Sequence, residues 1–281
     1  MIVFLNGQFV PEEKAVVSVL DRGFLYGDGL FESIRVYGGI PFRWPQHLAR
    51  LQRGAEFLNL RSPFSADELR QFADQLVTHN HLPEALLRLT LSRGIGPRGY
   101  SPRGADQPNL IMTLHPTPRV DRRNLACWKL VTASLRVPAK EKLNAFKTCN
   151  KLPQILARAE AEAQGADEAL LLNTDGEVAE AASSNLFWIA NGAVCTTPLE
   201  SGILAGVTRS IVLELCASLG IPAREIAIKP EALRRADGLF LSLSTLGIVE
   251  VISLDDHNLE CSPVTEQIRV GYDRLVRAET V

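Results

Sequence analysis

The 281-residue sequence lacks the patterns that mark several large classes of protein. No apolar run approaches the ~18 residues that a membrane helix needs. Residues 1–13 have neither the basic start nor the long apolar stretch of a signal peptide. The net charge of -2 at pH 7 gives no reason to expect a nucleic-acid or anionic-membrane partner. We therefore predict a soluble, cytoplasmic protein that binds neither nucleic acid nor membranes.

Cysteine and lysine are also scarce. The five cysteines are odd in number and form no C-x-x-C pair, which favours reduced thiols over a disulfide framework. The only close pair of histidines is His79 and His81, and their spacing at a predicted helix end puts them on different faces. We therefore expect solvated histidines, His47 among them, and no metal site. Lysine is confined to positions 14, 129, 140, 142, 147, 151 and 229.

Common nucleotide-binding and hydrolase motifs are missing as well. Residues 94–99 satisfy G-x-G-x-x-G after an apolar strand, but a dinucleotide fingerprint must also open a helix whose N-terminus receives the pyrophosphate. Pro97, Pro102 and Pro108 argue against such a helix, so we interpret residues 94–108 as a loop. The sequence has no P-loop and no G-x-S-x-G elbow.

The sequence does contain a mixture of strand and helix patterns that predicts two α+β domains. Residues 1–116 predict a small domain with hairpin turns at 6–7 and 38–39, helices over 47–60 and 65–80, and strands over 85–94 and 109–116. Residues 117–125 are short of apolar side chains, which indicates an interdomain linker. Residues 126–281 predict a larger C-terminal domain with a strand meander and helices over 152–165, 207–219 and 262–277.

The most informative region for chemistry is 140–209. The residues alone give little preference for Lys147 over its two neighbouring lysines. Glu180 lies in an apolar hairpin arm, where an inward-facing carboxylate needs a cationic partner. Residues 206–209 begin a helix with a threonine near its N-terminus, which suits phosphate, and hydroxyl side chains cluster at 242, 244 and 245. A lysine, a buried carboxylate and a phosphate cradle are what pyridoxal phosphate requires.

Several motifs match one family in order and spacing. They are GDGLFESIRVY (27–37), HLARL (47–51), KTCN (147–150), ADEALLLNTDGEVAEAASSNLFWI (166–189), ILAGVTR (203–209) and ADGLFLSLSTLGIVEV (236–251). Together they resemble the class IV aminotransferases, the fold-type IV pyridoxal-phosphate enzymes, over nearly the whole chain. The resemblance implies pyridoxal 5'-phosphate as cofactor, a two-domain mixed α/β fold like that of D-amino-acid aminotransferases, and a homodimer.

The resemblance also implies roles for individual residues. Lys147 is similar to the Schiff-base lysine of the family, Glu180 to the carboxylate that pairs with the pyridine nitrogen, and Arg50 to the phosphate-binding arginine. Leu204 matches an apolar residue that packs on the cofactor ring. The other implied phosphate ligands lie at a helix start and in a hydroxyl-rich turn, at Val207, Thr208, Ser244 and Thr245.

The segment SRGIGPRGYSPRG (92–104) is similar to a loop of 4-amino-4-deoxychorismate lyases. By that similarity Arg98 binds a substrate carboxylate through its guanidinium fork, Tyr100 shapes the same pocket, and Phe31 also faces the substrate. The resemblance therefore favours the lyase that forms 4-aminobenzoate and pyruvate. An aminotransferase acting on branched-chain or D-amino acids, or on amines, stays open, because D-amino-acid aminotransferases carry a similar arginine. A non-catalytic cofactor-binding relative also stays open.

Overall fold

The computed structural model describes residues 1–117 and 127–280, and the predicted linker at 117–125 lies almost wholly outside them. Contacts divide the chain into two compact units. The first unit comprises Met1–Arg119, Phe146–Asn150 and Ala278–Val281, and the second comprises Val120–Ala145 and Lys151–Arg277. The domain boundaries at 116 and 126 stay a prediction. The short segment around Lys147 nevertheless clusters with the first unit, apart from the sequence on either side of it.

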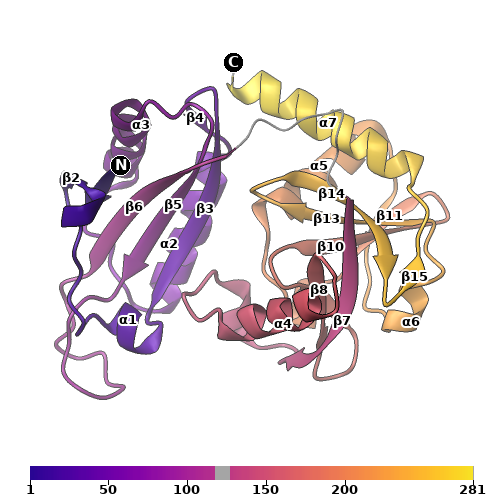
Figure 1. Cartoon of the computed structure of the whole chain (residues 1–281), viewed down its shortest axis with the longest axis horizontal. Helices are drawn as coiled ribbons and strands as arrows, with labels where there is room; N and C mark the ends of the chain where they lie inside the picture. The colour runs from indigo at the N-terminus through magenta and orange to yellow at the C-terminus, as the bar shows by residue number, and fades with distance from the viewer. Residues whose placement is uncertain (118–126, 281) are drawn as a thin grey trace. The chain divides into compact units, whose positions relative to one another are not determined.

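The first unit is built on a six-stranded antiparallel sheet in the order β2-β1-β6-β5-β3-β4 (Figure 1). Its strands are β1 (Ile2–Leu5), β2 (Gln8–Pro11), β3 (Gly29–Tyr37), β4 (Ile40–Pro41), β5 (Ala85–Ser92) and β6 (Asn109–Pro116). Its helices are α1 (Arg22–Tyr26), α2 (Trp44–Phe57) and α3 (Ala66–Asn80), with a 3-10 turn at Glu12–Lys14. The two hairpins and the two longer helices confirm the sequence prediction, whereas α1 was not predicted.

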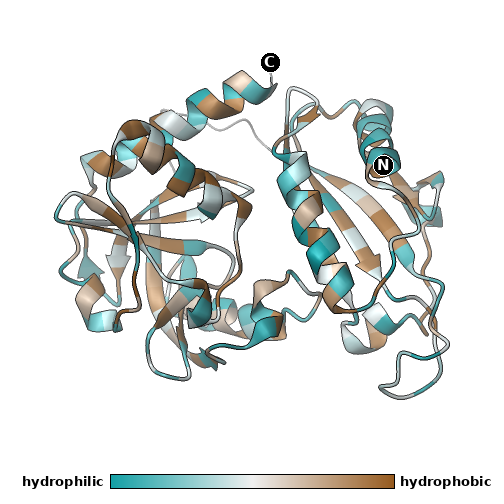
Figure 2. Cartoon of the chain, turned by 180° about the vertical axis from the view of Figure 1, so that it is seen from behind, coloured by the Kyte–Doolittle hydropathy of each residue, from teal (hydrophilic) through white to brown (hydrophobic). Residues whose placement is uncertain are grey.

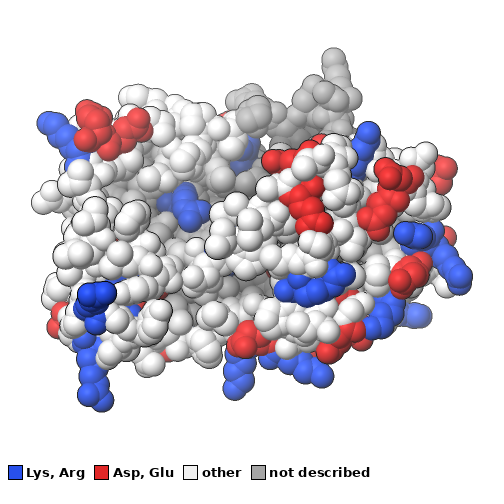
Figure 3. Space-filling model, turned by 60° about the horizontal axis from the view of Figure 1, so that its bottom comes forward, with Lys and Arg blue, Asp and Glu red and all other residues white. Residues whose placement is uncertain are grey.

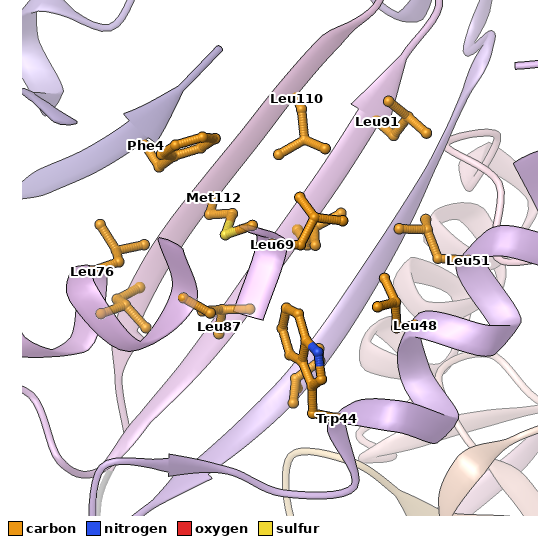
Figure 4. Packing of buried hydrophobic residues seen from close by; sticks show 14 of the residues in the cluster. Phe4, Trp44, Leu48, Leu51, Leu69, Leu76, Leu87, Leu91, Leu110 and Met112 are labelled. Atoms are coloured by element: carbon orange, nitrogen blue, oxygen red, sulfur yellow. The ribbon is translucent and has the colours of Figure 1, made fainter. Parts of the chain in front are cut away.

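The core of the first unit lies between this sheet and helices α2 and α3. Figure 4 shows strand residues such as Leu87 and Met112 facing Trp44 and Leu48 of α2 and Leu76 of α3. Hydrophilic residues alternate with hydrophobic ones along α2 (Figure 2), as expected for a helix with one buried face. Because strand side chains alternate between faces, the residues between the core positions of each strand point to the face that the helices leave uncovered.

The second unit is built on a nine-stranded mixed sheet in the order β12-β11-β10-β13-β14-β7-β8-β9, with β15 paired to β14. The strands are β7 (Cys127–Val137), β8 (Glu168–Asn173), β9 (Val178–Ala181), β10 (Asn185–Ala190), β11 (Ala193–Thr196), β12 (Ala223–Glu225), β13 (Gly238–Leu243), β14 (Gly247–Leu254) and β15 (His257–Asn258). The helices are α4 (Leu152–Ala163), α5 (Val207–Leu219), α6 (Pro230–Leu233) and α7 (Pro263–Thr280), with 3-10 turns at Lys142–Ala145 and Leu199–Ser201.

Local sequence signals explain where several helices begin and end. The Ser65 hydroxyl accepts a hydrogen bond from Glu68 N, and the Glu68 carboxylate accepts one from Ser65 N, which completes the predicted capping box of α3. Helix α5 ends at Gly220, whose φ of 68° suits glycine at this position. Residues 94–108 contain no helix, as predicted. Within the described ranges, no helix is both long and apolar enough to span a membrane.

Candidate active site

Lys147 lies in a short segment that extends the sheet of the first unit. Phe31 N donates a hydrogen bond to the carbonyl of Lys147 (2.9 Å), and Cys149 N donates one to the carbonyl of Gly29 (2.9 Å). Residues 147–149 therefore run antiparallel beside the beginning of β3. Main-chain hydrogen bonds fix the segment, so each of its side chains is assigned to one face of the sheet.

Alternation along this segment places the Lys147 amine on the face that α2 and α3 leave uncovered. Thr148 forms a bridge with Leu30 and, like that core leucine, is buried. Lys147 precedes Thr148 and therefore points to the opposite face. Its Nζ lies 4.8 Å from the centroid of the Phe31 ring. The structure thus brings together Lys147 and Phe31, two residues that the sequence analysis singled out separately.

Arg88 of β5 joins these two residues and was not predicted from the sequence. Arg88 lies opposite Ser33 in the sheet, on the same face as Phe31, and its Cζ is 3.9 Å from the Phe31 ring centroid. Burial lowers the pKa of the guanidinium, while the nearby Cys149 thiol acts in the opposite direction. Among the described residues, Arg88 makes no hydrogen bond or ion pair. The planar fork of a half-buried guanidinium without an anionic partner can bind a carboxylate or a phosphate.

Arg50 lies on the covered face of the same sheet, in a buried cluster with Glu32 and His47. Its guanidinium donates from Nε to Glu32 Oε1 (2.8 Å) and from Nη2 to Glu32 Oε2 (2.6 Å). His47 Nδ1 lies 2.7 Å from Glu32 Oε2. None of the three side chains is more than 4% exposed. Glu32 fixes the arginine that was predicted to bind phosphate, a role that was not predicted from the sequence.

The electrostatics of this cluster correct one prediction. His47 was expected to be solvated, but α2 packs against the sheet and leaves it 2% exposed. Burial lowers the pKa of His47, against the opposing effect of Glu32. Burial alone would raise the pKa of Glu32, but Arg50 and His47 outweigh it and lower that pKa to about 2. The cluster is therefore a neutral histidine beside an ionised carboxylate–guanidinium pair near neutral pH.

Glu180 is held in the second unit by hydrogen bonds from neighbouring segments. Its Oε2 accepts a hydrogen bond from Asn185 Nδ2 (3.0 Å) and another from the backbone N of Leu204 (3.1 Å). Asn185 Nδ2 also donates to the carbonyl of Leu204 (2.9 Å). Glu180 is half-buried on β9. These contacts join Glu180 to the backbone of Leu204 and add Asn185 as the side chain that connects them.

The start of α5 has the features of an anion site. No side chain caps the helix, although its first N–H groups have no intrahelical acceptor. A Cβ at Gly206, the residue before the helix, would lie 2.0 Å from Asn185 Oδ1, so the backbone approaches that side chain as only glycine allows. The hydroxyl of Ser242, directly opposite Asn185 in the sheet, is buried and has no hydrogen-bond partner among the described residues.

A buried arginine anchors the same helix to the strands near Glu180. Arg209 Nη2 donates to the carbonyl of Thr197 (3.0 Å) and to Glu225 Oε2 (2.6 Å). Thr197 in turn donates from its hydroxyl to the carbonyl of Ala179 (2.8 Å), the residue before Glu180. The predicted phosphate ligands Val207 and Thr208, both buried, are thereby fixed relative to Glu180. A rigid spacing between these two anchors is what a flat, phosphorylated ring requires.

The remaining predicted residues are more exposed. Ser244 and Thr245 are half-buried in the turn between β13 and β14. Arg98 is exposed, and Tyr100 is 88% exposed. Among the described residues, Arg98 makes no hydrogen bond or ion pair. The structure therefore does not bring Arg98 or Tyr100 into contact with Lys147.

Charged side chains of both signs are interspersed on the face shown in Figure 3, so this face has no strong field of one sign. In the ranges 1–117 and 127–280, no three histidine, cysteine or acidic side chains form a group that could hold a metal ion. All five cysteines lie in these ranges and none is in a disulfide, as the sequence predicted.

The fold is that of a mixed α/β enzyme that uses pyridoxal phosphate. The chain belongs to the amino-transferase class IV family, whose model matches residues 29–254. A putative branched-chain-amino-acid aminotransferase of Methanocaldococcus jannaschii is 34% identical, over 97% of this chain and 95% of that protein. The aminodeoxychorismate lyase of Bacillus subtilis is 30% identical, over 98% of this chain and 95% of that protein.

Solved structures give the same family. The branched-chain aminotransferase of Thermoproteus uzoniensis, solved with norvaline, superposes with a TM-score of 0.93 and 32% identity, over 99% of this chain and 95% of that one. The family is pyridoxal-phosphate-dependent, and another branched-chain aminotransferase of the same fold was solved with pyridoxamine 5'-phosphate.

The residues of this chain fit that cofactor. The uncapped start of α5 and the unpartnered Ser242 hydroxyl suit its phosphate, because they offer hydrogen-bond donors that no described residue uses. Glu180 suits its ring nitrogen, because hydrogen bonds from Asn185 and from the backbone of Leu204 fix the direction of its carboxylate.

Proposed function

We propose that this chain is a pyridoxal-phosphate enzyme whose substrate is an amine with two carboxylates, and that it is a 4-amino-4-deoxychorismate lyase. The observation that carries the proposal is a pair of arginines, Arg88 and Arg98, neither of which has an anionic partner among the described residues. Each guanidinium fork matches one carboxylate. Aminodeoxychorismate carries two, one on its ring and one on its enolpyruvyl group.

The roles of the individual residues follow from their chemistry. When bound, pyridoxal phosphate withdraws electrons from the substrate and makes its α-proton acidic. Lys147 would hold the cofactor covalently, and its Nζ would act as the base that removes that proton. Glu180 keeps the pyridine nitrogen protonated. The start of α5 would hold the phosphate, and the family resemblance gives Arg50 a phosphate-binding role as well. Within the first unit, the Phe31 ring lies 4.8 Å from the amine of Lys147.

The lyase reaction balances without a second substrate. The bond between the ring carbon and the enolpyruvyl oxygen breaks, and its electron pair leaves with the oxygen. The departing enolate takes up one proton and becomes pyruvate, while the ring, which has lost the α-proton, becomes 4-aminobenzoate. Formation of an aromatic ring drives the reaction forward.

Two observations support this reaction. The first is the loop sequence SRGIGPRGYS, which is similar to the corresponding loop of the lyases. The second is the presence of a lyase among the relatives that share nearly the whole chain.

Transamination of a branched-chain or D-amino acid is the second candidate. It is favoured by the 34% identity with a protein named as a branched-chain aminotransferase. In that case Arg88 binds the carboxylate of a monocarboxylic amino acid or the second carboxylate of 2-oxoglutarate. Both reactions use Lys147 and Glu180 in the same way, so only the products separate them.

The deciding experiment supplies the purified, cofactor-loaded protein with aminodeoxychorismate in one assay. Parallel assays supply L-leucine or D-alanine with 2-oxoglutarate. We expect 4-aminobenzoate and pyruvate in equal amounts in the first assay, and none with the Lys147→Ala variant. Glutamate formation without any 4-aminobenzoate would replace the lyase by the aminotransferase. No product in any assay would favour a non-catalytic relative.

We also propose that the protein works as a cytoplasmic homodimer. The first unit exposes a run of large apolar side chains around α1: Val16, Val17, Val19, Leu20, Phe24 and Leu25. Such a patch is typical of a protein interface. Light scattering coupled to size exclusion should give twice the 30.8 kDa of one chain, and Phe24→Asp should shift the protein toward the monomer. A monomeric mass for the unchanged protein would contradict the proposal.

A further inference from the structure

The loop that carries Arg98 is held by a buried arginine, Arg22. Arg22 opens α1, and its side chain is only 4% exposed. Its Nη1 donates a hydrogen bond to the carbonyl of Gly99 (2.8 Å), and its Nη2 donates one to the carbonyl of Tyr100 (3.2 Å). Its Nε donates to Asp28 Oδ2 (2.9 Å). One planar group therefore connects the residues just before β3 to the outer part of the loop.

Tyr26 completes this anchor. The backbone N of Gly99 donates a hydrogen bond to the Tyr26 hydroxyl (3.3 Å), and the guanidinium of Arg22 lies 5.0 Å from the centroid of the Tyr26 ring. The rings of Tyr26 and Tyr100 are 5.6 Å apart, edge to face. Gly99 is thus held through both its N–H and its carbonyl. Because Gly99 directly follows Arg98, these contacts fix the direction in which the chain leaves Arg98.

The anchor itself rests on the sheet. Arg22 N donates to the carbonyl of Gly94 at the base of the loop (2.8 Å). The carboxylate of Asp21 caps α1 and accepts hydrogen bonds from Ser92 Oγ (2.7 Å) and Asn109 Nδ2 (2.6 Å), which lie at the ends of β5 and β6. Helix α1 is therefore fixed to both strands from which the loop emerges. Arg22 in turn holds the loop through its hydrogen bonds to the carbonyls of Gly99 and Tyr100.

Asp28 orients the Arg22 guanidinium by accepting a hydrogen bond from its Nε. Burial opposes the ionisation of Asp28, but hydrogen bonds and charges from Arg93 and Arg22 hold its pKa below the ordinary value. Arg93 Nε also donates to Asp28 Oδ2 (2.8 Å). Asp28 consequently stays paired when Arg22 is shortened, so a conservative change at Arg22 releases the loop without leaving a carboxylate unpaired.

We propose that Arg22 is a positioning residue for substrate binding, which fixes Gly99 and Tyr100 so that Arg98 is presented to a substrate carboxylate. This role rests on the proposed function, in which Arg98 binds one of the two carboxylates. Arg22 does not touch the substrate. Only an arginine satisfies the site, because its planar fork donates to Asp28 and to two carbonyls at once, whereas the single ammonium of lysine cannot span all three acceptors.

The kinetic test is a double-mutant cycle with Arg22→Lys and Arg98→Ala, assayed with the substrate that the unchanged enzyme turns over. We expect Arg22→Lys to raise KM about 10-fold, the size expected for a lost charge-assisted contact, with little change in kcat. If Arg22 acts through Arg98, Arg22→Lys has no further effect once Arg98 is alanine. Effects that multiply independently would overturn the proposal, as would a loss confined to kcat.

Limited trypsin digestion tests the anchor without any activity. Arg22→Lys should speed cleavage after Arg98 several-fold, while cleavage after Arg234 and Arg235, exposed in the second unit, serves as an internal reference for general unfolding. Arg70→Lys is the matched control, because Arg70 pairs with Asp74 on the surface of α3 and should leave both rates unchanged.

An unchanged rate of loop cleavage in Arg22→Lys overturns the proposal whatever the activity. Faster loop cleavage in a chain that turns over none of the tested substrates supports the hold of Arg22 on the loop, while the proposed function itself fails. The two failures are thereby distinguished.

Discussion

Charged side chains are paired differently on the two faces of strand β3. On the face covered by α2 and α3, Glu32 is bonded to Arg50 and His47, and its carboxylate oxygens accept from both. On the uncovered face, Phe31 lies between the side chains of Lys147 and Arg88, and Arg88 has no anionic partner among the described residues. Glu32 therefore belongs to a buried cluster whose charges pair with one another. Its neighbour Phe31 lies on the other face beside Arg88, which has no anionic partner among the described residues.

The difference teaches how to separate scaffold charge from site charge. A charge buried on the covered face must be compensated by the protein itself, as the Glu32 carboxylate compensates the Arg50 guanidinium. A cation on the uncovered face keeps part of its solvation and tolerates the lack of an anion until a ligand supplies one. Changes on the covered face should therefore cost stability, whereas changes on the uncovered face should cost binding and catalysis.

The largest effect is expected on the uncovered face, at Lys147. Lys147→Ala should abolish the covalent adduct that borohydride fixes between the protein and pyridoxal phosphate, and should lower turnover by about 10²- to 10⁴-fold or more, the usual contribution of a positioned general base. Intact-mass spectrometry after borohydride treatment measures the adduct. Lys151→Ala is the control and should retain it. An adduct that persisted in Lys147→Ala would show that another lysine binds pyridoxal phosphate.

On the covered face, Glu32→Gln should lower the free energy of unfolding by about 3–5 kcal/mol, because it leaves Arg50 buried without its counterion. Urea denaturation measures this change. Asp74→Asn is the control, since Asp74 pairs with Arg70 on the surface of α3 and such pairs contribute only about 0.3–0.5 kcal/mol. A Glu32→Gln protein as stable as the control would mean that the covered network is not structural.

Arg88→Met should show most clearly that a change on the uncovered face affects substrate binding and not stability. We expect KM for a carboxylate-bearing substrate to rise about 10- to 100-fold, which corresponds to losing a charged hydrogen-bonding group worth ~1.5–3 kcal/mol. Stability should stay the same or increase, because methionine removes a half-buried cation. Steady-state kinetics and urea denaturation on the same preparation give both numbers. A large loss of stability with an unchanged KM would place Arg88 with the scaffold.

Much of the fold follows from the sequence because its signals are local. The Asn6-Gly7 turn, the capping box at Ser65 and the helix over 207–219 each depend on residues within a few positions of one another, and all three are confirmed. Helix α1 was not predicted, because its five residues offer no apolar periodicity and depend on Asp21 being bonded to Ser92 and Asn109. Those partners are distant in sequence.

The candidate site residues also differ in whether their signals are local in the sequence. Motifs led to Lys147, Arg50 and Glu180, but not to the side chains that position them, because Glu32 and Asn185 act through contacts across strands and helices. One signal for Arg88 was present in the sequence. It interrupts the leucines of ALLRLTLS at a position that strand alternation assigns to the face opposite the core. Its meaning depends on Phe31 and Lys147, which the sheet brings beside it.

The smallest effect concerns the pH dependence of the covered network. Because burial holds the pKa of His47 below the ordinary 6.5, the folded protein binds fewer protons than the unfolded chain once the pH falls below that value. Stability should therefore decrease as the pH falls from 6.5, by up to ~1.4 kcal/mol per pH unit. Glu32, with a pKa of about 2, stays ionised throughout and adds its own loss only below about pH 4.5.

His47→Gln should remove this slope while keeping a side chain that can donate a hydrogen bond to Glu32. The free energy of unfolding, measured in urea at pH 5.5 and pH 7.0, should then change less in His47→Gln than in the unchanged protein. His79→Gln is the control, because His79 is exposed near the end of α3 and should leave the slope as it was. Equal slopes in all three proteins would show that His47 takes up a proton in the folded state as readily as in the unfolded chain, and the covered face would then not be closed to protons.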